Sequence, residues 1–126
     1  MTTKKRFSSR ILADLEASRI LGIRAGSQPH RFIGIWMVIV QQRVFVRSWD
    51  IKPNGWYHAF LEEPVGTIQV SGREIPVRAR KARGERLMEA IDQAYRERYP
   101  TPGSRKYVEG FARARRRATT TELLPR

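Results

Sequence analysis

The segment from Arg47 to His58 gathers residue types that could bind a phosphorylated ring compound. It joins an expected strand to an expected helix, where backbone N–H groups without partners can bind phosphate. Cationic, amide and hydroxyl side chains add hydrogen-bond donors that suit phosphate oxygens. The candidate donors for a phosphate-bearing tail are Arg47, Ser48, Lys52 and Asn54.

The same segment carries Trp49, Trp56 and Tyr57, whose flat apolar surfaces could border a planar ring system. The alternative is structural: both tryptophans anchor the core and Lys52 is simply exposed. The sequence leaves both interpretations open. A phenol such as Tyr57 packed in a barrel wall is a weak candidate for proton transfer, so no catalytic residue is assigned.

The sequence lacks the residues that several other kinds of functional site require. The chain has no cysteine, which excludes disulfides and thiol nucleophiles. His30 and His58 are the only histidines, and no metal-ligand spacing includes them. Neither a nucleophile elbow nor a phosphate-binding Gly-Lys loop is present. The sequence predicts no metal site.

The chain of 126 residues carries 25 basic and 12 acidic residues, a net charge of +13, with the excess concentrated near both ends. A basic protein attracts polyanions, so a nucleic-acid-binding module is one alternative function. Its surface would run from Arg78, Arg80, Lys81 and Arg83 towards Arg113 to Arg117. No base-stacking or helix-turn-helix pattern accompanies these charges, so nucleic acid is not the favoured partner.

The elements that would position the Arg47–His58 segment begin with a hairpin. Ile33 to Val40 is β-branched and aromatic, Gln41-Gln42 supplies the turn, and Arg43 to Arg47 alternates polar and apolar residues. A strand that is apolar on both faces needs cover on both sides, as in a small barrel or at a dimer contact. We therefore expect a homodimer.

The remaining elements follow from turn and capping signals. We expect a helix from Ser8 or Ser9 to Gly22, a helical turn over Trp56 to Leu61, a hairpin of Val65–Val70 and Arg73–Lys81, helices over Gly84–Tyr99 and Ser104–Ala118, and an edge strand at Leu123-Leu124. Hairpins without crossovers imply an antiparallel sheet or barrel with helices packed outside. Residues 1–126 form one domain in this prediction, with 1–7 and 119–126 as flexible ends.

The longest apolar run is about eight residues, far below the roughly 20 that span a bilayer, and the basic start lacks the apolar core of a secretory signal. The sequence therefore predicts a cytoplasmic protein with no membrane partner.

The centre of the chain resembles the deazaflavin-dependent nitroreductase family. The resemblance lies in the run WYHAFLEEP at residues 56–64 and in IQVSGREIPVRAR at residues 68–80. It implies a split β-barrel of the flavin reductase and pyridoxamine-phosphate oxidase type. Ala59 stands where that family prefers Asn, and Arg24 to Ser27 only faintly matches its phosphate-contacting loop.

The whole chain is similar to an uncharacterised bacterial family, domain of unknown function 2255. The matching pieces are Ile35–Val40, Val44–Ser48, Trp56-Tyr57, Ala94–Arg96 and Thr121–Pro125. The two resemblances imply an antiparallel split β-barrel with peripheral helices. They also imply an oxidoreductase-like protein that binds FMN or a deazaflavin, a phosphorylated small-molecule cofactor. A non-catalytic split barrel that serves as an interaction protein is the third alternative.

Overall fold

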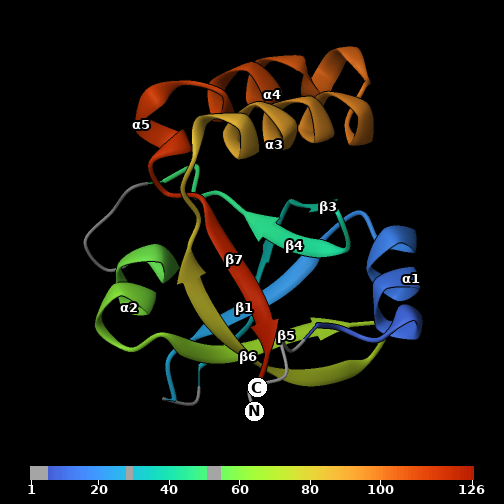
Figure 1. Ribbon diagram of the computed structural model, residues 1–126. Helices are drawn as coiled ribbons and strands as arrows, with labels where there is room; N and C mark the ends of the chain where they lie inside the picture. The colour runs from blue at the N-terminus through green and yellow to red at the C-terminus, as the bar shows by residue number, and fades with distance from the viewer. Residues whose placement is uncertain (1–5, 28–29, 51–54) are drawn as a thin grey trace.

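Seven strands, each antiparallel to its neighbours, form a nearly closed barrel in the computed structural model, which describes residues 6–27, 30–50 and 55–126 (Figure 1). Their order is β2-β1-β5-β6-β7-β4-β3. The strands are β1 (Leu21–Ala25), β2 (Ile33–Ile35), β3 (Met37–Val40), β4 (Arg43–Val46), β5 (Val65–Val70), β6 (Arg73–Lys81) and β7 (Thr121–Pro125). The barrel is split between the edge strands β2 and β3, which confirms the predicted fold.

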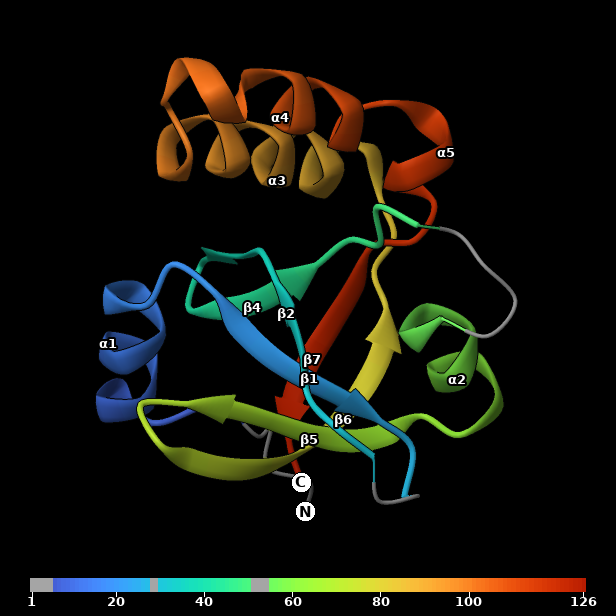
Figure 2. The ribbon, with the colours of Figure 1, turned by 180° about the vertical axis from the view of Figure 1, so that it is seen from behind.

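Helices surround the barrel. They are α1 (Ser9–Ala17), α2 (Trp56–Glu62), α3 (Glu85–Arg98), α4 (Arg105–Phe111) and α5 (Ala114–Arg117), with a short 3-10 helix at Pro102–Ser104. Helices α3, α4 and α5 form a layer over one end of the barrel, whereas α1 and α2 flank it on opposite sides (Figures 1 and 2). No helix in the described part of the chain has the length and apolarity needed to cross a membrane.

Both predicted hairpin turns are confirmed by their backbone angles. Gln41 and Gln42 have φ of 54° and 64°, and Ser71 and Gly72 have φ of 50° and 75°. Two consecutive residues with positive φ form the turn that matches the twist of antiparallel strands. Glutamine adopts this conformation less readily than asparagine or glycine, so the pairing of β3 with β4 must hold it in place.

The strand that is apolar on both faces is covered within one chain. Met37 and Val44 point into the barrel interior, while Val38 and Phe45 belong to a second apolar cluster with residues of α3 and α4. The helical layer therefore supplies the cover that the sequence suggested a second subunit would provide. The argument for a homodimer from this strand no longer holds.

Trp36 interrupts the expected strand over residues 33–40. Its indole stacks on Tyr99 with ring centroids 4.0 Å apart, at the residue where the chain passes from β2 to β3. The Tyr99 hydroxyl accepts a bond from Met37 N–H at 3.2 Å and donates one to Met37 C=O at 2.9 Å. One phenol thus satisfies the backbone groups at the start of an edge strand.

Three other predictions differ from the structure. The first helix is capped by Ser8 as expected but ends at Ala17, because Leu21 to Ala25 pairs as β1 with both β2 and β5. The predicted helix over 104–118 is divided into the 3-10 turn, α4 and α5. Residues 119–126, expected to be a flexible end and an edge strand, include β7, which lies between β4 and β6.

Candidate ligand-binding site

A pocket of about 440 Å³ lies beside the split in the barrel. Its walls come from β2, the chain that leaves β4, the start of α2, and α4. Among described residues, the lining is Ile20, Ile33, Gly34, Ile35, Trp36, Arg47, Ser48, Trp49, Asp50, Gly55, Trp56, Tyr107 and Phe111. The volume falls within the roughly 300–1,000 Å³ typical of small-molecule sites.

The pocket is aromatic and mostly apolar. Three tryptophans, one tyrosine and one phenylalanine line it, together with three isoleucines. Such walls bind a planar ring by burying its apolar surface and by edge-to-face contacts. Ser48 and Asp50 are its polar members beside Arg47 and Tyr107, and none of them forms a proton-relay pair with a histidine. The arrangement is suited to holding a ring.

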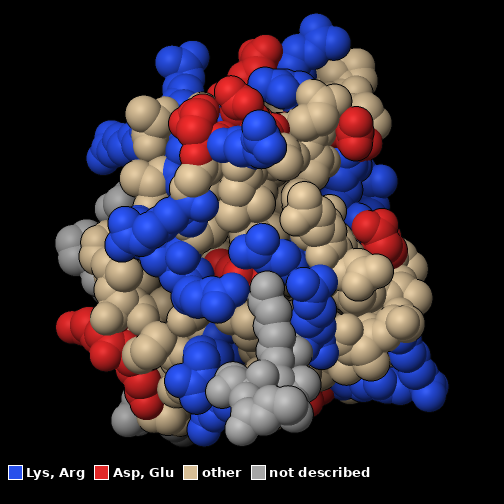
Figure 3. Space-filling view, viewed as in Figure 1, with Lys and Arg blue, Asp and Glu red and all other residues tan. Residues whose placement is uncertain are grey.

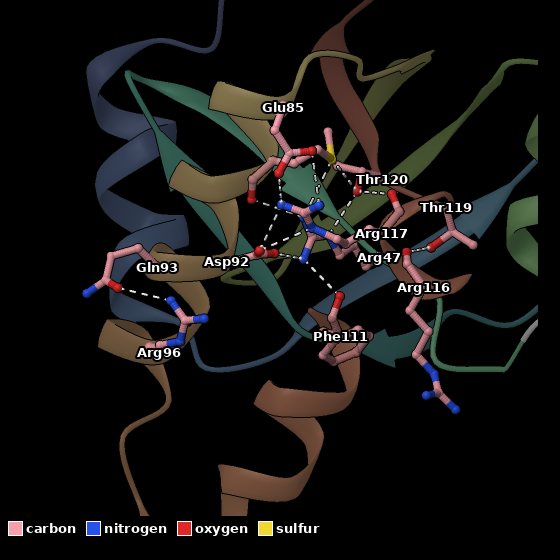
Figure 4. Close-up of polar contacts among 11 residues, drawn as sticks. Arg47, Glu85, Asp92, Gln93, Arg96, Phe111, Arg116, Arg117, Thr119 and Thr120 are labelled. Carbon is pink, nitrogen blue, oxygen red and sulfur yellow. Dashed lines mark hydrogen bonds and ion pairs between the residues drawn. The ribbon is translucent and has the colours of Figure 1, made fainter. Parts of the chain in front are cut away.

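Arg47 borders this pocket, but its guanidinium is bonded inside the protein (Figure 4). Its side chain has no exposed surface. The Nε atom donates to Thr120 Oγ1 at 2.8 Å, and one terminal nitrogen donates to Asp92 at 2.6 Å and to the Phe111 carbonyl at 2.9 Å. These donors are therefore bonded within the protein, and contact of Arg47 with a phosphate stays a prediction.

Asp92 extends this contact into a network across the helical layer. Its second carboxylate oxygen accepts from Arg117 Nε at 3.1 Å, and Arg117 also pairs with Glu85 at 3.0 Å (Figure 4). The network joins the end of β4 to α3 and α5. Nearby Tyr95 is completely buried, and this burial raises its pKa far above the ordinary value, so the phenol stays neutral.

Ser48 and Trp49 line the pocket as the sequence suggested, but Ser48 uses its polar groups locally. Its N–H donates to Thr119 Oγ1 at 2.9 Å, and its hydroxyl donates to the Asp50 carbonyl. Trp49 is half-buried and borders both the pocket and the apolar cluster beneath the helices. Its indole is thus both a wall of the site and part of the core.

Trp56 begins α2 and lines the pocket, whereas Tyr57 turns away from it. The Tyr57 hydroxyl accepts from Lys81 Nζ at 3.3 Å and lies 3.4 Å from the Ala118 carbonyl. Lys52 and Asn54 lie outside the described residues. The structure therefore brings Ser48, Trp49 and Trp56 together around one cavity and places Tyr57 on another surface.

Sequence reasoning missed the opposite wall. Trp36 was placed within the expected strand over residues 33–40, and Tyr107 and Phe111 were placed on one side of the expected helix over Ser104–Ala118. In the structure, both residues of α4 border the pocket. Their spacing correctly placed them on one face, but no local signal indicated that this face meets residues 47–49.

A basic surface lies away from this pocket, on the outer side of β4, β7 and β6 (Figure 3). Glu122 is buried there and receives two bonds from Arg43, both at 3.0 Å, and one from Arg80 at 2.7 Å. Burial raises the pKa of Glu122, but hydrogen bonds from Arg43 and Arg80 outweigh burial and leave that pKa below the ordinary value. Among the residues that the structure describes, no group of three acidic or histidine side chains forms a metal site.

An antiparallel barrel that is split between its edge strands, with an aromatic pocket beside the split, defines a split-barrel protein. The chain belongs to the family described as "Uncharacterized protein conserved in bacteria (DUF2255)", which matches residues 11–123. This assignment confirms the resemblance seen in the sequence. No functionally curated protein matches the chain.

Two solved structures share the fold. An F420-H2 dependent reductase, FDR-A, superposes with a TM-score of 0.59 at 20% identity, covering 84% of this chain and 93% of its own. The conserved hypothetical protein Rv2991 from Mycobacterium tuberculosis gives a TM-score of 0.56 at 15% identity, covering 96% of this chain and 83% of its own. At these identities the likeness establishes the architecture alone.

Proposed function

We propose that the pocket binds the ring of a deazaflavin or flavin and that the protein is an oxidoreductase-like cofactor binder. The observation that carries this proposal is the aromatic cavity formed by Trp36, Trp49, Trp56 and Phe111 beside the split. The shared fold with a protein described as an F420-H2 dependent reductase favours a deazaflavin over FMN. The bound cofactor would supply hydride chemistry, while this chain would supply binding and orientation.

The phosphate of such a cofactor must find donors other than the Arg47 guanidinium, whose nitrogens are already bonded. Ser48 likewise donates its hydroxyl proton to the backbone. Lys52 and Asn54 therefore remain the candidates that the sequence suggests for the charged tail. In this proposal the ring enters the aromatic cavity and the tail extends beyond it.

Fluorescence titration tests the proposal directly, because the three tryptophans of the chain all line the pocket. We expect saturable quenching by F420, by FMN, or by both, at concentrations on the order of tens of micromolar. Trp56→Leu should weaken binding, whereas Tyr57→Phe, outside the pocket, should leave it unchanged. Absence of saturable quenching by both compounds would reject the cofactor proposal and favour a non-catalytic interaction protein.

A homodimer remains a separate proposal. Ile20 and Ile33 are 52% and 44% exposed at the edge of the pocket, where a second copy could cover them. Light scattering on the purified protein should then give twice the mass of one chain, and Ile33→Glu should reduce it to one. A single-chain mass for the unaltered protein would exclude the dimer.

A second candidate function, polyanion binding, is favoured by the basic surface on β6. Arg78 and Arg80 alternate with buried or half-buried residues and are both exposed, and Lys81 follows them. We expect binding to duplex DNA, measured by fluorescence anisotropy, to weaken steeply with salt if this surface contacts phosphates. Arg78→Gln should reduce the salt slope by about one. Salt-independent or undetectable binding would reject this function.

A further inference from the structure

We propose that Arg116 is a positioning residue that fixes the Trp49 indole as a rigid wall of the pocket, an inference that rests on the proposed ring-binding function. Its guanidinium lies 3.7 Å from the centre of the Trp49 ring, and its Nε donates to the Trp49 carbonyl at 3.0 Å. One side chain of α5 therefore holds both the ring and the backbone of a pocket residue.

The backbone around Trp49 is held by neighbouring C-terminal residues as well. Arg47 Nε donates to Thr120 Oγ1, and Ser48 N–H donates to Thr119 Oγ1. Both threonine hydroxyls donate in turn to backbone carbonyls of α5, at 2.7 and 2.6 Å, so that their orientations are fixed. Three consecutive residues after β4 are thus each bonded to the segment 116–120.

The indole itself has little freedom. Arg116 covers one face, while the rings of Tyr107 and Phe111 are inclined to the indole by 62° and 79°, at centroid distances of 4.9 and 5.4 Å. At Gly110 a methyl group would lie 2.5 Å from the Trp49 ring, so the absence of a side chain there lets the indole lie against α4. The surface of Trp49 left uncovered borders the pocket.

This arrangement separates two roles that Arg116 could have. If Arg116 bound a phosphate, its guanidinium would need free donors, and a lysine at this position could partly replace it. A positioning residue needs the planar guanidinium and Nε–H, which Lys lacks. A preorganised wall lowers the entropy that is lost on binding. A more mobile Trp49 should therefore weaken the binding of different ring ligands to a similar extent.

The experiment compares riboflavin and FMN, which share a ring but differ by a phosphate, using Arg116→Gln and Arg116→Lys. Arg115→Gln is the matched control, because Arg115 is its exposed neighbour in α5 and the charge change is identical. We expect both Arg116 variants to bind both ligands about three- to thirtyfold more weakly, with the control unchanged. Circular dichroism in the far ultraviolet checks that each variant is folded.

A readout without ligand tests the position of Trp49 independently. The near-ultraviolet circular dichroism of the unliganded protein should change in Arg116→Gln, and this change should disappear when Trp49→Phe is also present. Trp49 would also become more accessible to acrylamide quenching.

Several results would overturn the inference: full rescue by Arg116→Lys, weakening for FMN alone, or an unaltered near-ultraviolet spectrum. If the unaltered protein binds F420 but neither riboflavin nor FMN, the same variants are compared with F420. If it binds none of the three compounds, the proposed function fails, and the role of Arg116 in ligand positioning fails with it. In that case a changed near-ultraviolet spectrum would still show that Arg116 fixes Trp49, so the two failures are distinguishable.

Discussion

Removing the charge of Asp92 should destabilise the protein more than removing its buried partner Arg47. In Asp92→Asn, the guanidinium of Arg47 keeps its charge with none of its side-chain surface exposed, and its remaining acceptors among the described residues are neutral. Leaving a buried charge without its counterion costs about 3–5 kcal/mol. The variant also loses the 3.1 Å contact between Asp92 and Arg117.

The reverse change is milder for a structural reason. In Arg47→Met, Asp92 is 11% exposed and retains Arg117, so its charge is still paired. The variant is still destabilised because acceptors such as the Phe111 carbonyl lose their hydrogen bond from Arg47, which costs about 1–3 kcal/mol. A double variant, Arg47→Met with Asp92→Leu, should be more stable than Asp92→Asn alone, because neither charge stays buried without a partner.

Urea unfolding followed by circular dichroism measures all three free energies of unfolding. A total stability of about 5–15 kcal/mol leaves the Asp92→Asn variant folded at low urea. The reasoning is refuted if Asp92→Asn loses less than Arg47→Met, or if the double variant is the least stable of the three.

Three further predictions concern other parts of the barrel. At neutral pH, Glu122→Gln should have a lower free energy of unfolding than the unaltered protein, and this difference should shrink as the pH falls below about 4.5. The reason is that the pKa of Glu122 is lowered in the fold, so its carboxylate stabilises the fold only while it is charged. Urea titrations at several pH values measure the difference, and a difference that does not change with pH would contradict the prediction. Gly66→Ala should cost about 1–3 kcal/mol, since the new methyl group would lie 2.5 Å from the Arg24 carbonyl, whereas Gly103→Ala, with open space around it, should have little effect on thermal unfolding; equal effects would refute the steric argument. Tyr99→Phe should cost about 1–3 kcal/mol and speed amide exchange at Met37, and unchanged exchange there would show that the phenol does not protect this edge.

Most strands and both hairpin turns of the barrel could be predicted from the sequence, because the residue patterns that indicate them are local. Alternation in Arg43–Val46 and the β6 strand, and the residues at both hairpin turns, placed these elements correctly. The short strand β1 was missed, because its apolar positions also fit the stripe of the preceding helix. The sequence did not predict that the strand is interrupted at Trp36, because the ring on which Trp36 stacks belongs to Tyr99, 63 residues later.

Only part of the candidate site could be predicted from the sequence, for a related reason. Trp49 and Trp56 are near each other in sequence and both line the pocket. Arg47 was assigned to the ligand because an arginine at a strand end has donors for phosphate. Nothing local to that position shows that Asp92, Thr120 and the Phe111 carbonyl would use those donors.

The position of β7 explains how the C-terminal residues come to shape the pocket. Because β7 pairs with β4 on one side and β6 on the other, the residues just before it lie beside the residues just after β4. Antiparallel pairing of Val46 with Thr121 therefore continues outward, beyond the ladder, as Arg47 with Thr120 and Ser48 with Thr119. The continuation carries α5, and with it Arg116, to Trp49. A basic C-terminal segment that the sequence suggested as part of a polyanion-binding surface is thus placed by strand register against the wall of the pocket. Its four-residue helix α5 has arginine at positions 115–117, yet of these three only Arg115 is exposed, because the other two each contact a residue of the site or its supporting network.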